Sequence, residues 1–234
     1  MNQLANNSAM QQDMPSTIIE TIRPSFAADG LVSSFVDQVE SPIKLFGGGD
    51  NGRSGALTFF DRSGNWYVFL VSVVLQRKHG LLNVQRNHAF LDAMVAMAGG
   101  PKHVVVAYER SRKNPMFGAK NNYVNGRNEE FWRVSLSERR IRNHSVDPKT
   151  WQSDCFIGID GEDTKARARE YIRRRCLNTE WLESYNKAPR EAIVDAMCLA
   201  LWCQDHYAEL PVSEEIPLSD GSVARFWSPL VAAC

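Results

Sequence analysis

Three carboxylic acids in this sequence, Asp50, Glu109 and Asp195, are placed where they could act together on a metal ion. Asp50 lies in the glycine-rich stretch 46–55, whose glycines leave its carboxylate open to a phosphate or a metal. Glu109 ends a β-branched run, and Asp195 is the one central charge of an apolar helical stretch. Carboxylates brought together repel one another unless a divalent cation neutralises them, so their convergence would specify a hard-metal site with oxygen ligands. Two such ions can activate a water molecule and stabilise the leaving oxygen of a phosphodiester.

Two of these acids, Asp50 and Asp195, also have a purely structural interpretation. For Asp50 the alternative is a solvated residue in a glycine-rich hairpin turn, because short glycine-rich motifs have many false positives. For Asp195 it is a buried carboxylate that accepts hydrogen bonds from backbone amides. An ionised carboxylate in apolar surroundings is costly unless a cation or hydrogen-bond donors compensate it, so Asp195 is expected to have a partner.

The strands that would carry the first two acids follow from short apolar and β-branched runs. The runs 43–46 and 56–60, closed by the turn signal 61–65, predict a β-hairpin with Asp50 on its first strand. The run 66–74 lacks clean alternation and predicts a buried strand. Two shorter strands are expected at 103–109 and 141–146.

The helices are predicted from apolar residues at helical spacing. The expected ranges are 81–98, 128–140, 164–177 and 190–207, with loops at 110–120 and 147–152. The last range is apolar nearly all round, so its helix should be buried. Strands and helices in alternation predict an α/β fold in which helices cover a sheet.

Length and charge indicate one domain with extensions. The 234 residues suffice for one sizeable core, and we expect a loosely docked N-terminal arm at 1–42, a folded body at 43–208 and a C-terminal tail at 209–234. The formal net charge is zero, but the arm carries −4 and the tail −3, so the body carries +7. A basic body that concentrates its carboxylates at a few places fits a metal-dependent enzyme acting on a polyanion, while the alternative is a solvated basic face without a ligand.

Cysteine usage and the N-terminal sequence bear on the compartment. The five cysteines form no Cys-x-x-Cys pair and have no histidine at metal spacing, which favours a reduced cytosolic compartment over a disulfide framework or a zinc site. The polar start, 1–16, has neither the basic nor the apolar region of a secretory signal. No window approaches the apolar length of a membrane span. We therefore expect a cytoplasmic protein.

The order of the motifs resembles the RuvC family of Holliday junction resolvases in the ribonuclease H-like superfamily, particularly its divergent phage-type members. The first matching motif is Gly-x-Asp-x-Gly-x-x-Gly around Asp50, and the second is the strand that ends Ala107-Tyr108-Glu109. The other matching features are Gly126-Arg127, Phe131-Trp132, the segment 144–148 with Trp151, Lys165-Ala166-Arg167-Ala168 and Val194-Asp195-Ala196. The resemblance spans roughly residues 43–208 and implies a ribonuclease H-like mixed sheet flanked by helices. It also implies that the cell is bacterial or phage-infected.

The resemblance also implies the activity and the residues that carry it. It implies a homodimer that nicks two symmetry-related strands of branched DNA by hydrolysis, with Asp50, Glu109 and Asp195 as Mg²⁺ ligands and Mn²⁺ as a substitute ion. The acid that the family usually has three residues before the helix Asp is Ala192 here, but Glu191 lies on the same helical face as Asp195 and could serve as a catalytic and metal-binding residue. The Pro usual after the first acid is Asn51. The residues expected to contact DNA are Arg53, Arg110, Arg112, Lys113, Phe117, Lys120, Lys149, Lys165 and Arg169.

Three alternative functions remain open from the sequence. One keeps the fold and changes the substrate to forks, flaps or RNA–DNA hybrids. Another is a non-catalytic, structure-specific DNA-binding protein, since the usual fourth acid is absent. The third is an actin-like or sugar-kinase-like ATPase, whose first hairpin also carries an Asp and a glycine-rich turn, but such proteins need two domains and this chain has room for one.

Overall fold

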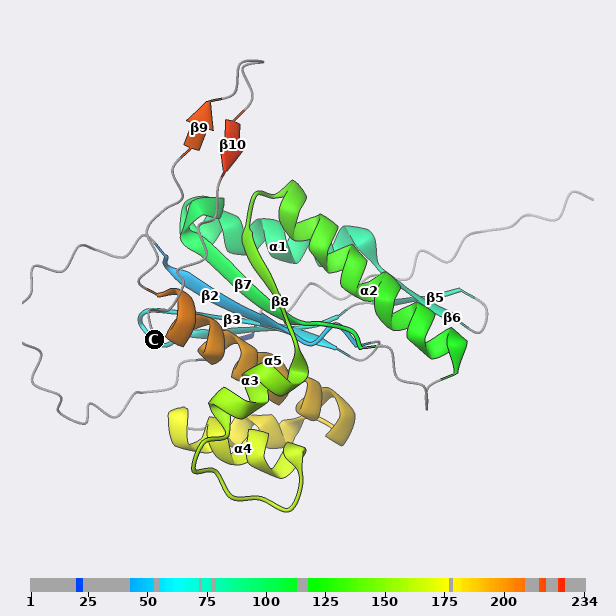
Figure 1. Cartoon of the computed structure of the whole chain (residues 1–234), viewed down its shortest axis with the longest axis vertical. Helices are drawn as coiled ribbons and strands as arrows, with labels where there is room; N and C mark the ends of the chain where they lie inside the picture. The colour runs from blue at the N-terminus through cyan, green and yellow to red at the C-terminus, as the bar shows by residue number, and fades with distance from the viewer. Residues whose placement is uncertain are drawn as a thin grey trace, which may run out of the picture.

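The computed structural model describes residues 20–22, 43–52, 55–71, 73–76, 79–112, 118–176, 179–208, 215–217 and 223–225. Its centre is a mixed six-stranded sheet in the order β1-β4-β3-β2-β7-β8, with helices on both faces (Figure 1). The strands of this sheet are β1 (Glu20–Ile22), β2 (Leu45–Gly49), β3 (Ala56–Asp61), β4 (Trp66–Leu70), β7 (Val104–Glu109) and β8 (Arg142–Val146).

Strand order and direction confirm the predicted fold class. β2 and β3 form the expected antiparallel hairpin, and β2 lies parallel to β7, which lies parallel to β8. Without the edge strand β1, the five strands take the order 3-2-1-4-5 by their appearance in the chain. This is the ribonuclease H-like arrangement, a mixed α/β sheet flanked by helices.

The helices divide between the two faces of the sheet, as Figure 1 shows for α1 and α2 above it and α3 to α5 below it. The α-helices are α1 (Val84–Ala98), α2 (Ala119–Glu138), α3 (Pro148–Cys155), α4 (Thr164–Arg175) and α5 (Lys187–Tyr207). Strand β7 serves both cores by alternation, because Val105 packs in the core of α5 while Val104 and Val106 pack in the core of α1. As its apolar sequence predicted, α5 is buried along most of its length.

A glycine brings α5 close to the central strand. A Cβ atom on Gly48 would lie 1.9 Å from the carbonyl oxygen of Ala196 and 2.4 Å from the amide nitrogen of Ala200. The backbones of β2 and α5 therefore approach to a distance that only glycine allows. The glycines around Asp50 were expected to open its carboxylate to a ligand, and Gly48 instead serves helix–strand packing.

Several element boundaries differ from the predicted ones. The run 66–74 is two strands, β4 and β5 (Val73–Gln76), and β5 pairs with β6 (His79–Leu82) in a separate hairpin that precedes α1. Helix α2 begins nine residues before the predicted start. The prediction omits these residues because the polar first half of the helix has little apolar periodicity. The predicted loop 147–152 contains the start of α3.

The extensions are described only in short pieces. Residues 20–22 of the predicted arm pair with β4 at the edge of the sheet. In the predicted tail, β9 (Glu215–Pro217) pairs with β10 (Val223–Arg225) in a two-stranded ladder. The remaining parts of both extensions lie outside the described residues. Among the cysteines described, Cys155, Cys176, Cys198 and Cys203 are free and buried. Within the part of the chain that the structure describes, no helix is long and apolar enough to cross a membrane.

Candidate active site

Asp50 and Glu109 lie at the carboxyl end of the two central parallel strands. Asp50 directly follows β2 and Glu109 is the last residue of β7, and the register pairs the residues just before them, Gly49 with Tyr108. Parallel neighbouring strands end at the same edge of a sheet, so the two acids come next to each other. The amide of Gly52 donates a hydrogen bond of 2.9 Å to Asp50 Oδ1 and orients that carboxylate.

Helix α5 brings Asp195 to the same end of the sheet. Asp195 directly precedes Ala196, whose carbonyl lies against Gly48 of β2. The Asp195 residue is 8% exposed. Its Oδ2 accepts from the ammonium of Lys165 near the start of α4, whereas its Oδ1 is buried without a hydrogen-bond partner. A buried carboxylate oxygen with no donor is costly. Asp195 therefore has one oxygen that a further cation could satisfy.

The pKa values show that the three acids share one electrostatic environment. Burial, followed by the charges of Asp50 and Asp195, raises the pKa of Glu109 to about 7. Burial raises the pKa of Asp195 to about 6 against the opposing charge of Lys165, and burial also raises the pKa of Asp50. Acids that oppose one another's ionisation in this way are the groups that a cation would stabilise.

Glu191 and Lys165 belong to the same environment. The charge of Glu191 raises the pKa of Asp195 and also raises the pKa of Lys165. Burial lowers the pKa of Lys165, but the attraction of Asp195, Asp50 and Glu191 outweighs burial and the net shift is upward. Lys165 thus interacts electrostatically with all four predicted acids and forms an ion pair with Asp195.

The four acids are chemically suited to a hard divalent cation, but their side chains are not arranged as a metal-binding cluster. All four acids offer carboxylate oxygens, and Asp195 Oδ1 lacks a donor. Nevertheless, among the described residues no three Asp, Glu, His or Cys side chains lie close enough together to hold one ion. Lys165 acts as the counter-ion of Asp195. Metal binding would therefore require the acid side chains to move toward one another.

Neighbouring polar groups fix Glu109 and the turn after Asp50. The indole Nε1 of Trp151 donates to Glu109 Oε2 at 3.2 Å. Asn51, which is 6% exposed, donates from Nδ2 to the backbone oxygen of Glu109 at 2.5 Å, and Asn128 donates to the backbone oxygen of Asn51 at 3.3 Å. The residue that replaces the usual Pro therefore joins the ends of β2 and β7.

Removal of the Asn51 side chain is expected to destabilise the protein. Asn51→Ala leaves the backbone oxygen of Glu109 without this donor, which should lower the free energy of unfolding by about 1–3 kcal/mol. Urea unfolding measures the loss. The matched control is Asn143→Ala, because the Asn143 side chain makes a local 2.9 Å bond to the carbonyl of Ile141, and its removal should cost less. Equal losses in the two variants would contradict a special role for Asn51.

Glu129 of α2, a carboxylate outside the predicted set, links the ends of β7 and β8. Glu129 Oε2 accepts from the amide of Ser111 at 2.9 Å, and Glu129 Oε1 accepts from the hydroxyl of Ser145 at 2.9 Å. The hydroxyl of Ser111 in turn donates to the carbonyl of Asn125 at 3.0 Å. These bonds hold the first residues after Glu109 against α2.

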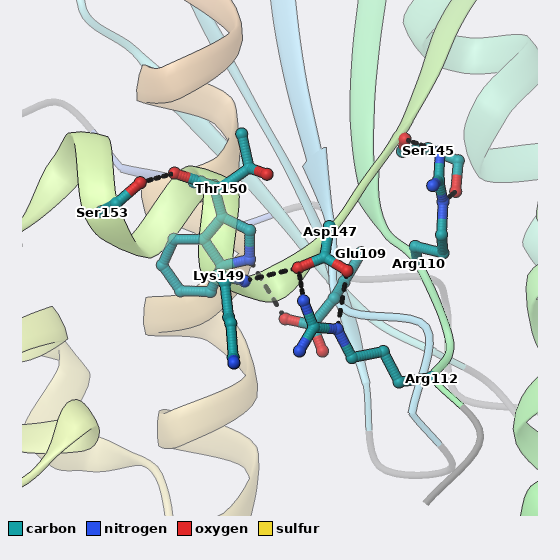
Figure 2. A network of polar contacts seen from close by, with 9 residues as sticks. Glu109, Arg110, Arg112, Ser145, Asp147, Lys149, Thr150 and Ser153 are labelled. Carbon is teal, nitrogen blue, oxygen red and sulfur yellow. Dashed lines mark hydrogen bonds and ion pairs between the residues drawn. The ribbon is translucent and has the colours of Figure 1, made fainter.

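Several residues expected to contact DNA already bind protein groups, as Figure 2 shows for two of them. Arg110 donates to the carbonyl of Ser145 at 3.1 Å, and Arg112 forms a bidentate ion pair with Asp147, with Nε 2.6 Å from Oδ2. Lys165 binds Asp195. Arg110, Arg112, Lys120, Lys149 and Arg169 of the predicted set are exposed, and Lys165 is partly buried. Arg53, Lys113 and Phe117 lie outside the described residues.

The sequence reasoning missed the roles of Trp151 and of the Lys165–Asp195 pair. In the sequence Trp151 stands out only as part of a motif, because the spacing predicts a loop over 147–152. Asp147-Pro148 is a helix-start signal, an N-cap acid followed by Pro at the first helical position, and it could have revealed α3. Nothing in the local sequence around Lys165 or Asp195 shows that the two side chains meet.

Comparisons with known proteins give a likeness in structure only. No protein-family model matches the sequence, and no curated protein matches it. Among solved structures, Thermus thermophilus RuvC in complex with a Holliday junction substrate is 17% identical over 68% of this chain and 90% of that chain, with a TM-score of 0.42. A second Thermus thermophilus RuvC structure is 18% identical over 67% of this chain and 91% of that chain, with a TM-score of 0.38. The chain is thus similar in structure to RuvC at low sequence identity.

Proposed function

We propose that this protein is a divalent-metal-dependent endonuclease that nicks branched DNA and resolves Holliday junctions by phosphodiester hydrolysis. The observation that carries the proposal is the meeting of Asp50, Glu109 and Asp195 at one end of the sheet, where the pKa of each acid is raised. Burial is the main cause of these shifts, and repulsion between the acids adds to those of Glu109 and Asp195. Buried acids of this kind do not stabilise a fold by themselves and are typical of a functional site. The solved RuvC structure with a Holliday junction substrate suggests the class of DNA.

In the proposed mechanism Asp50, Glu109 and Asp195, assisted by Glu191, would hold Mg²⁺, with Mn²⁺ as a substitute. When bound, the metal supplies an activated water and stabilises the leaving oxygen of the phosphodiester. Lys165 forms an ion pair with Asp195. It would be free to bind a DNA phosphate if Asp195 held the metal instead. Exposed Lys120, Lys149 and Arg169 would bind the DNA backbone, because phosphate contacts position a duplex without reading its sequence.

The proposed enzyme acts as a homodimer. A four-way junction presents two symmetry-related strands, and a two-fold dimer places one set of acids at each of them. Paired nicks at symmetric positions are the signature of this arrangement. The protein would belong to a phage-type branch of DNA recombination and repair nucleases.

A panel of labelled substrates tests the proposed substrate class. Purified protein with Mg²⁺ is incubated with an immobile four-way junction, a replication fork, a flap, a linear duplex and an RNA–DNA hybrid. The proposal predicts symmetric paired nicks in the junction and little cleavage of the linear duplex. Preferential cleavage of the hybrid, the fork or the flap would show that this substrate, and not the four-way junction, is the preferred one.

One observation favours a second candidate, a non-catalytic DNA-binding protein. Lys165 already neutralises Asp195, and no three potential metal ligands in the described ranges form a cluster. Such a protein would bind four-way junctions selectively and bind no Mn²⁺ at the acids. Calorimetric titration with Mn²⁺ separates the two candidates.

A further inference from the structure

Trp151 makes a direct contact with one of the proposed metal ligands. Its indole is fully buried, at 0% exposure, and its Nε1 lies 3.2 Å from Glu109 Oε2. An indole N–H can only donate a hydrogen bond, so its buried position requires an acceptor at this point. The contact engages one of the two carboxylate oxygens of Glu109 and leaves Oε1 for another partner.

The helix that carries Trp151 is held at both ends. At its start, Asp147 caps α3 by accepting from the amide of Lys149 at 2.9 Å, and Asp147 is also bound by Arg112 from the chain after β7 (Figure 2). At its end, Asp154 Oδ2 accepts from the indole of Trp202 on α5 at 2.8 Å. Helix α3 is therefore fixed to the two elements that carry Glu109 and Asp195.

We propose that Trp151 is a positioning residue for Glu109. Its N–H holds Oε2 and thereby directs Oε1 toward the space shared with Asp50 and Asp195. The proposal rests on the proposed function, because it assigns the contact to the preparation of a metal ligand. Partners that orient a ligand in this way tune metal affinity without touching the metal.

Mn²⁺ binding to the variant Trp151→Phe tests the positioning role. Phe keeps an aromatic ring in the core but lacks the donor, and the expected result is an Mn²⁺ affinity about 10-fold weaker by calorimetry. The matched control is Trp66→Phe, because Trp66 is buried in the same core at 1% exposure but lies on β4, which β3 and β2 separate from β7. The control should lose stability to a similar degree and bind Mn²⁺ as the wild type does.

Two results would overturn the positioning role. One is an unchanged Mn²⁺ affinity in Trp151→Phe, and the other is an equal loss in Trp66→Phe, which would show that any lost indole weakens the site. If Trp151→Phe does not fold, the indole N–H signal of Trp151 in the metal-free protein provides the test by nuclear magnetic resonance. Glu109→Ala should shift that signal and leave the Trp66 signal in place, and an unmoved Trp151 signal would contradict the contact.

These measurements separate the positioning role from the proposed function. A wild-type protein that binds no Mn²⁺ contradicts the metal-dependent function and, with it, the assigned purpose of the contact. If the wild type binds Mn²⁺ and Trp151→Phe binds it with the same affinity, the positioning role alone is contradicted.

Discussion

Glu109→Gln is expected to abolish DNA cleavage and, in the absence of metal, to make the protein more stable than the wild type at pH 8. The pKa of Glu109 is raised to about 7 by burial and then by the charges of Asp50 and Asp195, well above its ordinary value of 4.5. Ionised Glu109 therefore opposes folding. Gln has the same shape without the charge and can still accept from Trp151.

The sign of the pH dependence follows from that shift. Below about pH 4.5 Glu109 is protonated in both states, so its ionisation costs no stability. Between pH 4.5 and about 7 the folded state keeps a proton that the unfolded state releases, so the free energy of unfolding falls as the pH rises. The loss is complete above pH 7 and amounts to roughly 1–3 kcal/mol. Asp195, with a pKa raised to about 6, adds a loss of the same sign.

Urea unfolding in a chelator at pH 5 and pH 8 measures this effect. The wild type should be less stable at pH 8, and Glu109→Gln should reduce the difference between the two pH values. The matched control is Glu130→Gln, since Glu130 lies on the surface in an ion pair with Arg133 and bears no raised pKa. A Glu109→Gln protein that is no more stable than the wild type at pH 8 would contradict the shared electrostatic environment.

Gly48→Ala is expected to cause a large loss of stability. The added methyl group would lie 1.9 Å from the backbone oxygen of Ala196, and rigid backbone atoms cannot move aside as a flexible side chain does. Helix α5 must then shift away from β2, at a cost of about 3 kcal/mol or more. The shift would also carry Asp195 away from Asp50, so the Mn²⁺ affinity should fall with the stability.

Gly126→Ala is the matched control for that substitution. Gly126 lies inside α2, and a Cβ atom there would meet nothing within 4 Å. Ala is the better helix former by about 0.5–1 kcal/mol, so this variant should be slightly more stable than the wild type. Thermal or urea unfolding of both variants gives the comparison. A Gly48→Ala protein as stable as Gly126→Ala would contradict the close packing of α5 on β2.

Periodicity predicted the parts of the fold that bury a regular apolar pattern. The β2–β3 hairpin, strand β7 and helix α5 were found because their apolar runs are long and bounded by turn signals. The first half of α2 was missed because Asn121, Asn122 and Gly126 are weak helix formers and carry no apolar stripe. Helix α3 was missed because it is only eight residues long.

The candidate site was predictable as a set of acids but not as a set of contacts. Asp50, Glu109 and Asp195 stand out as charges beside apolar runs, and the sheet edge then brings the first two together. The partner of Asp195 is thirty residues away in Lys165, and the donor to Glu109 is forty-two residues away in Trp151. Such pairs depend on how α3, α4 and α5 pack, which no local pattern specifies. The assignment of these acids as metal ligands stays a prediction.

The most direct test of the central claim is cleavage of an immobile four-way junction by the wild type and by Asp50→Asn, with and without Mg²⁺. The account predicts paired symmetric nicks that require both Mg²⁺ and the wild-type acid. It also predicts that Asp50→Asn binds the junction as tightly as the wild type or more tightly, because the substitution removes a negative charge facing the phosphates. Cleavage by Asp50→Asn at the wild-type rate, or no cleavage by either protein despite tight junction binding, would contradict a metal-dependent active site at these acids.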